Sequence, residues 1–347
     1  MSDLIPIARS CWKIGAVRVA NHLSNRFEQK KLLGNFGFPF VVLRKQRPVQ
    51  ILLYHRVNDD LDWSFPGTPT SLFAKQMEYL AETHQVLDLA DAAKRLAAND
   101  VPDNAIVITF DDGYQDNFLN AFPVLKKLSL PATVFLAIDA IGTGRLLWHD
   151  RVFNAFRETQ AAYLPEFPEK QCYPLGTVLE KAQAQDSVLK FVFSLGEKER
   201  DTWIDRLVAK LQVPCRRSQA GLMLSWDQVA SMHQNGVAFG SHTMTHPITT
   251  RLPVNRMCEE IVESKKTLEA RLGTAITTFA YPKGGVGDFD ATTRGLLIEA
   301  GYHCAVTTLF GVNKPGQDLY ELKRGTPWEQ DVDSFALKLA WYRFAAA

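Results

Sequence analysis

The sequence predicts an α/β protein built as a barrel of parallel strands, and three observations lead to this prediction. From residue 50 onward, short apolar runs alternate with amphipathic helical stretches, as in strands joined by crossover helices. About seven such runs occur, which favours a barrel over the open doubly wound sheet that the same alternation allows. Polar groups follow several of these runs, and in barrels the functional side chains gather at the carboxyl ends of the strands.

The expected elements are defined by the two periodicities of the apolar residues. Continuous apolar runs of four to six residues predict buried strands, and apolar residues repeated every three or four positions predict helices. The expected strands are Gln50–Tyr54, Ala105–Phe110, Ala132–Ala137, Val237–Gly240, Thr277–Tyr281, His303–Thr307 and Tyr320–Lys323. The expected helices are Ser71–Thr83, Leu89–Ala98, Asn117–Leu128, Trp226–Gln234 and Val254–Leu272.

Residues 141–222 interrupt the alternation between the third and fourth expected strands. Ordinary connections are about 2–6 residues long, so a segment of this length is expected to form a helical insertion. Helices are expected within it at Glu180–Leu195 and Lys198–Leu211. A substrate-binding flap and a passive helical decoration are both compatible with this pattern.

Residues 1–48 form a basic extension before the main domain, which we expect to comprise residues 49–347. The extension carries nine Lys or Arg against two acidic residues, although the formal net charge of the whole chain is only +1. Apolar residues recur at helical spacing between positions 4 and 31, which predicts an amphipathic helix. Such a helix either lies on an anionic membrane surface or packs on the outside of the main domain.

The remaining composition narrows the class of protein. The chain is 46% hydrophobic and 22% charged, as in a globular protein, and its five cysteines are scattered without paired spacing. No apolar run reaches the roughly 18 residues of a membrane-spanning helix. We therefore expect a protein that is cytoplasmic or peripheral to the inner membrane, with no nucleic-acid partner.

Two short polar segments on apolar runs carry the chemistry. Asp111 and Asp112 end one expected strand, and His242 and His246 follow another. Two histidines four apart can meet one ion if their segment makes a helical turn. One Asp with two His leaves a divalent cation an open position for water or substrate, and the second Asp is free to act as a base. Alternatively, the acidic pair caps the following helix and the histidines lie on a solvated face.

Three motifs resemble those of the polysaccharide deacetylase family, also called carbohydrate esterase family four. The resemblance covers roughly residues 50–140 and 222–325 and includes segments typical of the exopolysaccharide-modifying branch. The three motifs, in the order of the family, are Thr109-Phe110-Asp111-Asp112-Gly113, Ser241-His242-Thr243-Met244-Thr245-His246-Pro247 and Phe279-Ala280-Tyr281-Pro282-Lys283-Gly284.

The resemblance implies a distorted, incomplete (β/α) barrel that hydrolyses an N-acetyl group with the help of a metal ion, usually zinc. It implies that Asp111 is the general base and that the backbone N–H of Lys283 helps to stabilise the oxyanion. The implied metal ligands are Asp112, His242 and His246. The residues expected to contact substrate are Tyr281, Pro282, Lys283 and Trp148.

The sequence departs from the family pattern at two positions. Many members carry an arginine that braces the catalytic base where this chain has Ala280, so another group must orient Asp111. Many also place a histidine near the last strand, where this chain reads Leu322-Lys323-Arg324-Gly325. We expect His55 to be the general acid instead, because it follows the first strand at the same barrel mouth. A histidine bonded only to a neighbouring loop is the alternative, and His149 is expected to line the substrate groove if it has a role.

The sequence thus predicts a metal-dependent hydrolase that removes acetyl groups from N-acetylhexosamine units of a bacterial exopolysaccharide or its lipid-linked precursor. The substrate partner would be an N-acetylated glycan or glycolipid. Hydrolysis of another C–N bond or of an O-acetyl ester is the alternative within enzymes. A catalytically silent glycan-binding protein is the alternative outside them.

Overall fold

Seven parallel strands follow one another around a nearly closed barrel. The computed structural model describes residues 47–60, 62–167 and 172–346. Each strand pairs in parallel with its neighbour, so all carboxyl ends lie at the same end of the barrel. In order around the barrel the strands are β1 (Gln50–Tyr54), β3 (Ala105–Phe110), β4 (Thr133–Leu136), β7 (Ala238–Ser241), β8 (Thr278–Ala280), β9 (Cys304–Phe310) and β10 (Leu322–Arg324).

The predicted incomplete barrel of about seven strands is confirmed. The expected limits of β1 and β3 match the structure, and the other strands differ at one or both ends by one to three residues. The main sheet contains one short strand that was not expected, β2 (Gln85–Leu87), which pairs with the start of β3. Its first residue is exposed and its second half-buried, so it lacks the continuous apolar run that marks a buried strand.

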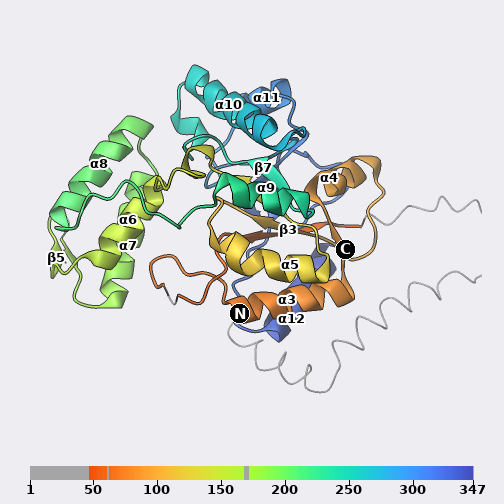
Figure 1. Ribbon diagram of the computed structural model, residues 1–347, viewed down its shortest axis with the longest axis horizontal. Helices are drawn as coiled ribbons and strands as arrows, with labels where there is room; N and C mark the ends of the chain where they lie inside the picture. The colour runs from red at the N-terminus through yellow and green to blue at the C-terminus, as the bar shows by residue number, and fades with distance from the viewer. Residues whose placement is uncertain (1–46, 61, 168–171, 347) are drawn as a thin grey trace, which may run out of the picture.

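Helices surround the barrel as the alternation predicts. The expected helix Asn117–Leu128 is divided into a π-helical turn, η1 (Asn117–Ala121), and α5 (Phe122–Leu128). The other expected helices are α3 (Thr70–Thr83), α4 (Leu89–Ala98), α9 (Trp226–Gln234) and α10 (Val254–Leu272). Two further helices, α11 (Ala291–Glu299) and α12 (Val332–Ala346), and two 3₁₀ turns, η2 (Ile138–Ala140) and η3 (Thr249–Arg251), complete this layer. Helices such as α3, α5, α9 and α10 lie on the outside of the strands (Figure 1).

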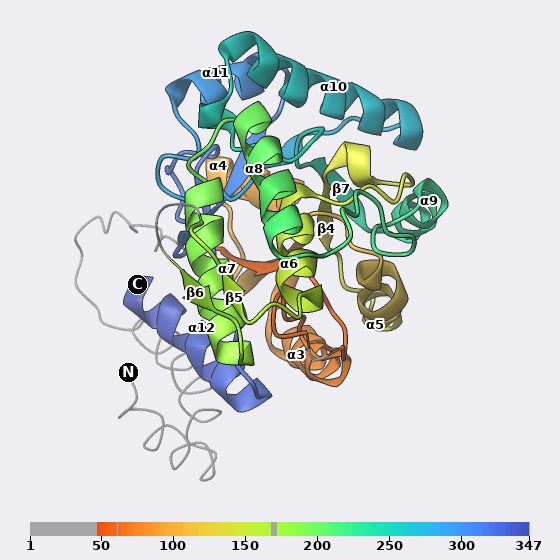
Figure 2. The same cartoon turned by 90° about the vertical axis from the view of Figure 1, so that its left-hand side faces the viewer.

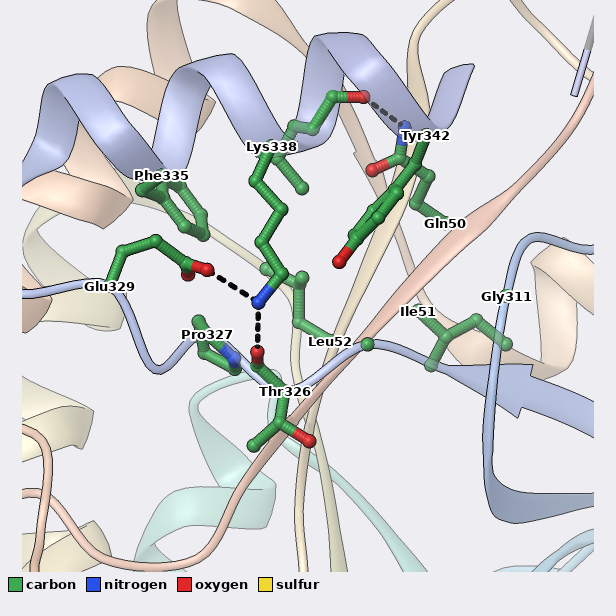
Figure 3. Close-up of a pocket in the computed structure, with 12 residues that line it drawn as sticks. Gln50, Ile51, Leu52, Gly311, Thr326, Pro327, Glu329, Phe335, Lys338 and Tyr342 are labelled. Carbon is green, nitrogen blue, oxygen red and sulfur yellow. Dashed lines mark hydrogen bonds and ion pairs between the residues drawn. The ribbon is translucent and has the colours of Figure 1, made fainter. Parts of the chain in front are cut away.

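The barrel closes between its first and last strands. Leu53 donates its N–H to the carbonyl of Gly325 at 3.0 Å, and Gly325 donates to Ile51 at 2.8 Å. Helix α12 covers this seam: Figure 3 shows Lys338 reaching from α12 to Glu329 and to the carbonyl of Thr326. The last strand is thereby fixed against the first.

The insertion forms a helical subdomain with its own apolar core. It contains α6 (Trp148–Glu158), α7 (Val178–Val192) and α8 (Glu197–Lys210), with a short antiparallel pair, β5 (Tyr163–Leu164) and β6 (Tyr173–Pro174). Figure 2 shows these helices in front of the barrel, with the outer helices arranged around them. The core of the subdomain includes Val152, Phe156, Val188, Ile204 and Leu207.

The predicted amphipathic helix of the basic extension lies outside the described residues. Within the part of the chain that the structure describes, no helix has the length and apolar character needed to cross a bilayer.

Candidate active site

The two adjacent carboxylates follow β3 at the carboxyl end of the barrel. Asp111 and Asp112 are each 2% exposed. The chain turns at Gly113, whose φ is +87°. A Cβ atom at Gly113 would lie 2.6 Å from the side chain of Leu136, so only glycine fits this close turn. The turn directs the two neighbouring side chains into different surroundings.

Asp111 pairs with an arginine that sequence reasoning missed. Arg324 donates from Nη1 and Nη2 to the two carboxylate oxygens of Asp111 at 2.8 and 2.6 Å, and it is 1% exposed. Its Nε–H donates to the carbonyl of Thr307 at 2.7 Å. Arg324 therefore occupies the bracing role that the sequence left without a residue when Ala280 was found in the third motif.

The arginine keeps Asp111 ionised although the carboxyl group is buried. Burial is the largest effect and raises the pKa of Asp111, but the positive charge of Arg324 and then the influence of His242 outweigh it. The pKa therefore lies below its usual value. An ionised carboxylate held in this way is available to accept a proton.

Asp112, His242 and His246 come together as a three-residue cluster that can hold a metal ion. Their ligand atoms all lie within 4.8 Å of one another, and all three residues are buried. Asp112 Oδ1 lies 3.5 Å from His242 Nε2 and 3.2 Å from His246 Nε2. The structure thus joins β3 and β7 at one site, as the sequence predicted.

The loop between the histidines is not the helical turn that would have explained their spacing. No helix covers residues 242–246, and Thr243 and His246 have φ values of +68° and +59°. The left-handed backbone at these two residues bends the loop so that both imidazoles face Asp112. The expected helical turn was therefore wrong, whereas the two imidazoles do lie together as expected.

The polar atoms of the cluster fit a divalent cation. The Nδ1–H of His242 donates to the carbonyl of Ala280 at 2.7 Å, which leaves Nε2 free to bind an ion. Asp112 Oδ1 and His246 Nδ1 are buried without a hydrogen-bond partner among the described residues. One carboxylate oxygen with imidazole nitrogens is a donor set that suits zinc.

Strained backbone concentrates at this site. Four residues of the three motifs have a left-handed backbone without being glycine: Asp112, Thr243, His246 and Lys283, with φ between +59° and +73°. Such conformations persist only where the surroundings fix them, and they are common at functional sites. Four of the nine such residues in the described part of the chain therefore lie in the three motifs.

His55 lies at the carboxyl end of β1, at the same end of the barrel as the two carboxylates. It follows β1, is half-buried, and its carbonyl accepts a hydrogen bond from Asn117 Nδ2 at 2.8 Å. The His55 ring is a small influence that lowers the pKa of Asp111 and of Asp112, after larger effects from Arg324 and the other histidines. The position is suitable for a proton donor at the same barrel mouth.

The third motif contributes its backbone rather than its aromatic side chain. Tyr281 is 0% exposed; its ring stacks on Phe289 and its hydroxyl donates to the carbonyl of Tyr320. Pro282 is also buried. Lys283 is exposed, and its backbone N–H has no acceptor among the described residues. A substrate role for Tyr281 and Pro282 stays a prediction, while Lys283 presents a free donor.

The insertion contributes one histidine, His149, which lies next to the Asp112, His242 and His246 cluster. His149 Nε2 lies 3.0 Å from the hydroxyl of Tyr114 and 3.8 Å from Asp112 Oδ2. The Tyr114 hydroxyl donates to Asp150 at 2.8 Å. Burial lowers the pKa of His149 to about 3, so this imidazole is neutral near pH 7. The preceding residue, Trp148, is only 4% exposed, and its role in substrate binding stays a prediction.

Two adjacent carboxylates and a histidine cluster at the carboxyl ends of parallel strands are the site of a hydrolase. A sequence model of the polysaccharide deacetylase family matches residues 98–305, which is more than half of the chain. The chain belongs to the polysaccharide deacetylase family.

Individual relatives agree with this assignment. The Bacillus subtilis protein YxkH is 23% identical over 82% of this chain and 73% of its own length. The poly-beta-1,6-N-acetyl-D-glucosamine N-deacetylase of Escherichia coli K12 is 33% identical over 23% of this chain, which corresponds to only 12% of that enzyme. The Streptococcus pyogenes deacetylase PplD shares the fold, with a TM-score of 0.59 and 18% identity over 85% of this chain and 98% of PplD.

Proposed function

We propose that this protein removes N-acetyl groups from N-acetylhexosamine units of an exopolysaccharide or its lipid-linked precursor, with a zinc ion held by Asp112, His242 and His246. The observation that carries the proposal is the pair of adjacent buried carboxylates with different partners. Asp111 pairs with Arg324, and Asp112 faces two imidazoles. The local likeness to an enzyme named for poly-N-acetylglucosamine supports the choice of substrate.

Each residue of the site has a role that follows from its position. When bound, the zinc ion supplies Lewis-acid activation of the water and of the acetyl carbonyl. Asp111, kept ionised by Arg324, accepts the proton of the attacking water. The backbone N–H of Lys283 donates to the developing oxyanion, and His55 donates a proton to the leaving amine.

The proposal is tested by measuring both products of the reaction. The purified protein is incubated with N-acetylated glucosamine oligomers, and released acetate and free amine are quantified before and after chelation. Equal amounts of acetate and amine, lost on chelation and restored by zinc, are expected. Acetate release from an O-acetylated oligomer tested in parallel, with neither product from the N-acetylated one, would identify an O-acetyl esterase, and oligomer binding without acetate would identify a glycan-binding protein. Either outcome would contradict the proposal.

We also propose that the basic extension holds the protein against an anionic membrane surface on the cytoplasmic side. The excess of seven positive charges in residues 1–48 supports this placement. The full chain should sediment with anionic vesicles at low salt and be released at high salt. Equal sedimentation with neutral vesicles would contradict an electrostatic attachment.

A further inference from the structure

The insertion reaches the loop between the two metal-site histidines at two points. The Nε1–H of Trp148, at the start of α6, donates to the carbonyl of His246 at 2.9 Å. Glu197, at the start of α8, places Oε1 3.2 Å from the hydroxyl oxygen of Thr245, within polar contact of the loop. Both contacts cross from the helical subdomain to the barrel.

Glu260 on α10, one of the helices around the barrel, also binds this loop. Glu260 is 0% exposed, and its Oε2 accepts the backbone N–H groups of Met244 at 2.7 Å and Thr245 at 2.9 Å. Its Oε1 accepts the Thr245 hydroxyl at 2.8 Å and Arg256 Nη2 at 2.6 Å. A buried carboxylate is tolerated here because every one of these groups donates to it.

Arg256 and Trp148 connect these contacts to the body of the insertion. Arg256, besides binding Glu260, places its Nε 3.6 Å from Glu197 Oε2. The Trp148 ring packs edge-on against Phe193, and the guanidinium of Arg200 lies 4.8 Å from the ring centroid. The docked insertion, the loop and α10 are therefore linked by one continuous set of polar and aromatic contacts.

We propose that Glu260, Trp148 and Glu197 form a loop clamp that positions residues 243–246 and thereby sets the affinity of the site for its metal ion. The inference rests on the proposed function, because it assumes that Asp112, His242 and His246 bind the ion. Its physical basis is the left-handed backbone at Thr243 and His246, which persists only where surrounding contacts hold it.

The clamp gives the insertion a role other than a substrate flap. If docking of the insertion strengthens ion binding, the ion must strengthen docking of the insertion by the same factor, because coupling between two binding events is reciprocal. The helical subdomain is then a positioning element of the metal site, and its contact with the barrel is tightest in the ion-loaded protein.

The test measures the dissociation constant for zinc in the full chain, by competition with a chromophoric chelator well below the melting temperature of each variant. Trp148→Phe removes the Nε1–H and keeps the aromatic ring, and Glu260→Gln removes the charge and keeps the size. Each is expected to raise the dissociation constant about 10- to 100-fold, as for other groups that orient metal ligands.

Matched controls lie close to each position. Trp203→Phe makes the same change on α8 of the insertion, where the ring packs on Phe191 and not on the loop. Glu263→Gln makes the same change on α10 at an exposed side chain whose described partner is Lys266. Both controls should bind zinc as tightly as the unaltered protein, although either change can alter the melting temperature.

Three outcomes separate the clamp from the metal site itself. Weaker zinc binding in Trp148→Phe and Glu260→Gln, with unchanged binding in the controls, supports the clamp. Zinc binding within about threefold of the unaltered protein in Trp148→Phe overturns the clamp alone, even if Glu260→Gln fails to fold. Absence of zinc binding by the unaltered protein overturns the proposed metal site and the clamp with it.

Discussion

The two carboxylates at the end of β3 are neighbours in sequence and equally buried, yet the regions around them neutralise charge in different ways. On one side, Asp111 meets the permanent positive charge of Arg324 from β10. On the other side, Asp112 faces His242 and His246, and burial lowers the pKa of His242 to about 4. The first carboxylate has its counter-ion within the fold, whereas the second faces a neutral His242 near pH 7.

This difference explains how two adjacent acids can have separate roles. Burial, the largest effect, raises the pKa of Asp112, but His246 and His149 outweigh it and the pKa lies below the usual value. An ionised Asp112 beside a neutral His242 lacks a full counter-ion, which the proposed zinc ion would supply. Asp111 already has Arg324 as its counter-ion, so its carboxylate needs no metal ion and can accept a proton. Substitutions on the two sides should therefore have different effects, and the largest is expected at the metal cluster.

The largest effect is expected on the imidazole side. Asp112→Ala or His242→Ala removes one of three ligands, so the protein should retain no zinc after desalting and its turnover should fall to background. Metal analysis and acetate release measure the two effects. His233→Ala, on α9 away from the site, is the control. Zinc retention by Asp112→Ala would show that the cluster is not the metal site.

Asp111→Asn should separate the two sides. The substitution removes the base and keeps the size of the side chain, so the turnover number should fall about 10²- to 10⁴-fold, as for the loss of a general base. Zinc content should remain that of the unaltered protein, because Asp111 is not a ligand. Turnover close to that of the unaltered protein would contradict the role of Asp111.

His55→Gln should affect the amide reaction more than the ester reaction. An amine needs a proton to leave, so deacetylation of an N-acetyl sugar should slow about 10²-fold. Hydrolysis of an aryl acetate, whose phenolate leaves without a proton, should slow far less. His303→Gln, exposed before β9, is the control. Equal losses on both substrates would mean that His55 acts in some other way.

Arg324→Lys should produce the smallest change, visible mainly in the pH profile. Lysine keeps the charge but loses one of two charge-assisted hydrogen bonds, each about 1.5–3 kcal/mol, so the pKa of Asp111 should rise by about one to two units. Activity requires ionised Asp111 and is lost as pH falls through its pKa. The acidic limb should therefore move to higher pH, with little change in the plateau rate. An unmoved limb would contradict the pairing of Arg324 with the base.

The apolar runs and the motifs of the sequence predicted the strands and the residues that gather at their carboxyl ends. The apolar runs at β1 and β3 fixed those strands to the residue, because each run is buried along its whole length. Motif order placed Asp112, His242 and His246 together, since parallel strands deliver their carboxyl ends to one face. The resemblance to the family then implied a role for each of these residues, because their spacing alone does not assign one.

Contacts between distant segments were missed because sequence spacing carries no signal for them. Arg324 lies 213 positions from Asp111 and stands in a short run that shows only a strand. The sequence showed that Asp111 lacked the arginine usual in the family. The available clue was an arginine, Arg324, directly after another expected strand. The contacts of Trp148 and Glu197 with the histidine loop were missed for the same reason, since the insertion lies outside the motifs.

The position of Arg324 on the last strand has a consequence for how the protein is made. A chain emerging from the ribosome has already delivered both carboxylates and both histidines while β10 is still being synthesised. Burying Asp111 at that stage would leave a charge without its partner, at a cost of about 3–5 kcal/mol. We therefore expect the seam between β1 and β10 to close in the same late step in which Asp111 acquires its Arg324 partner.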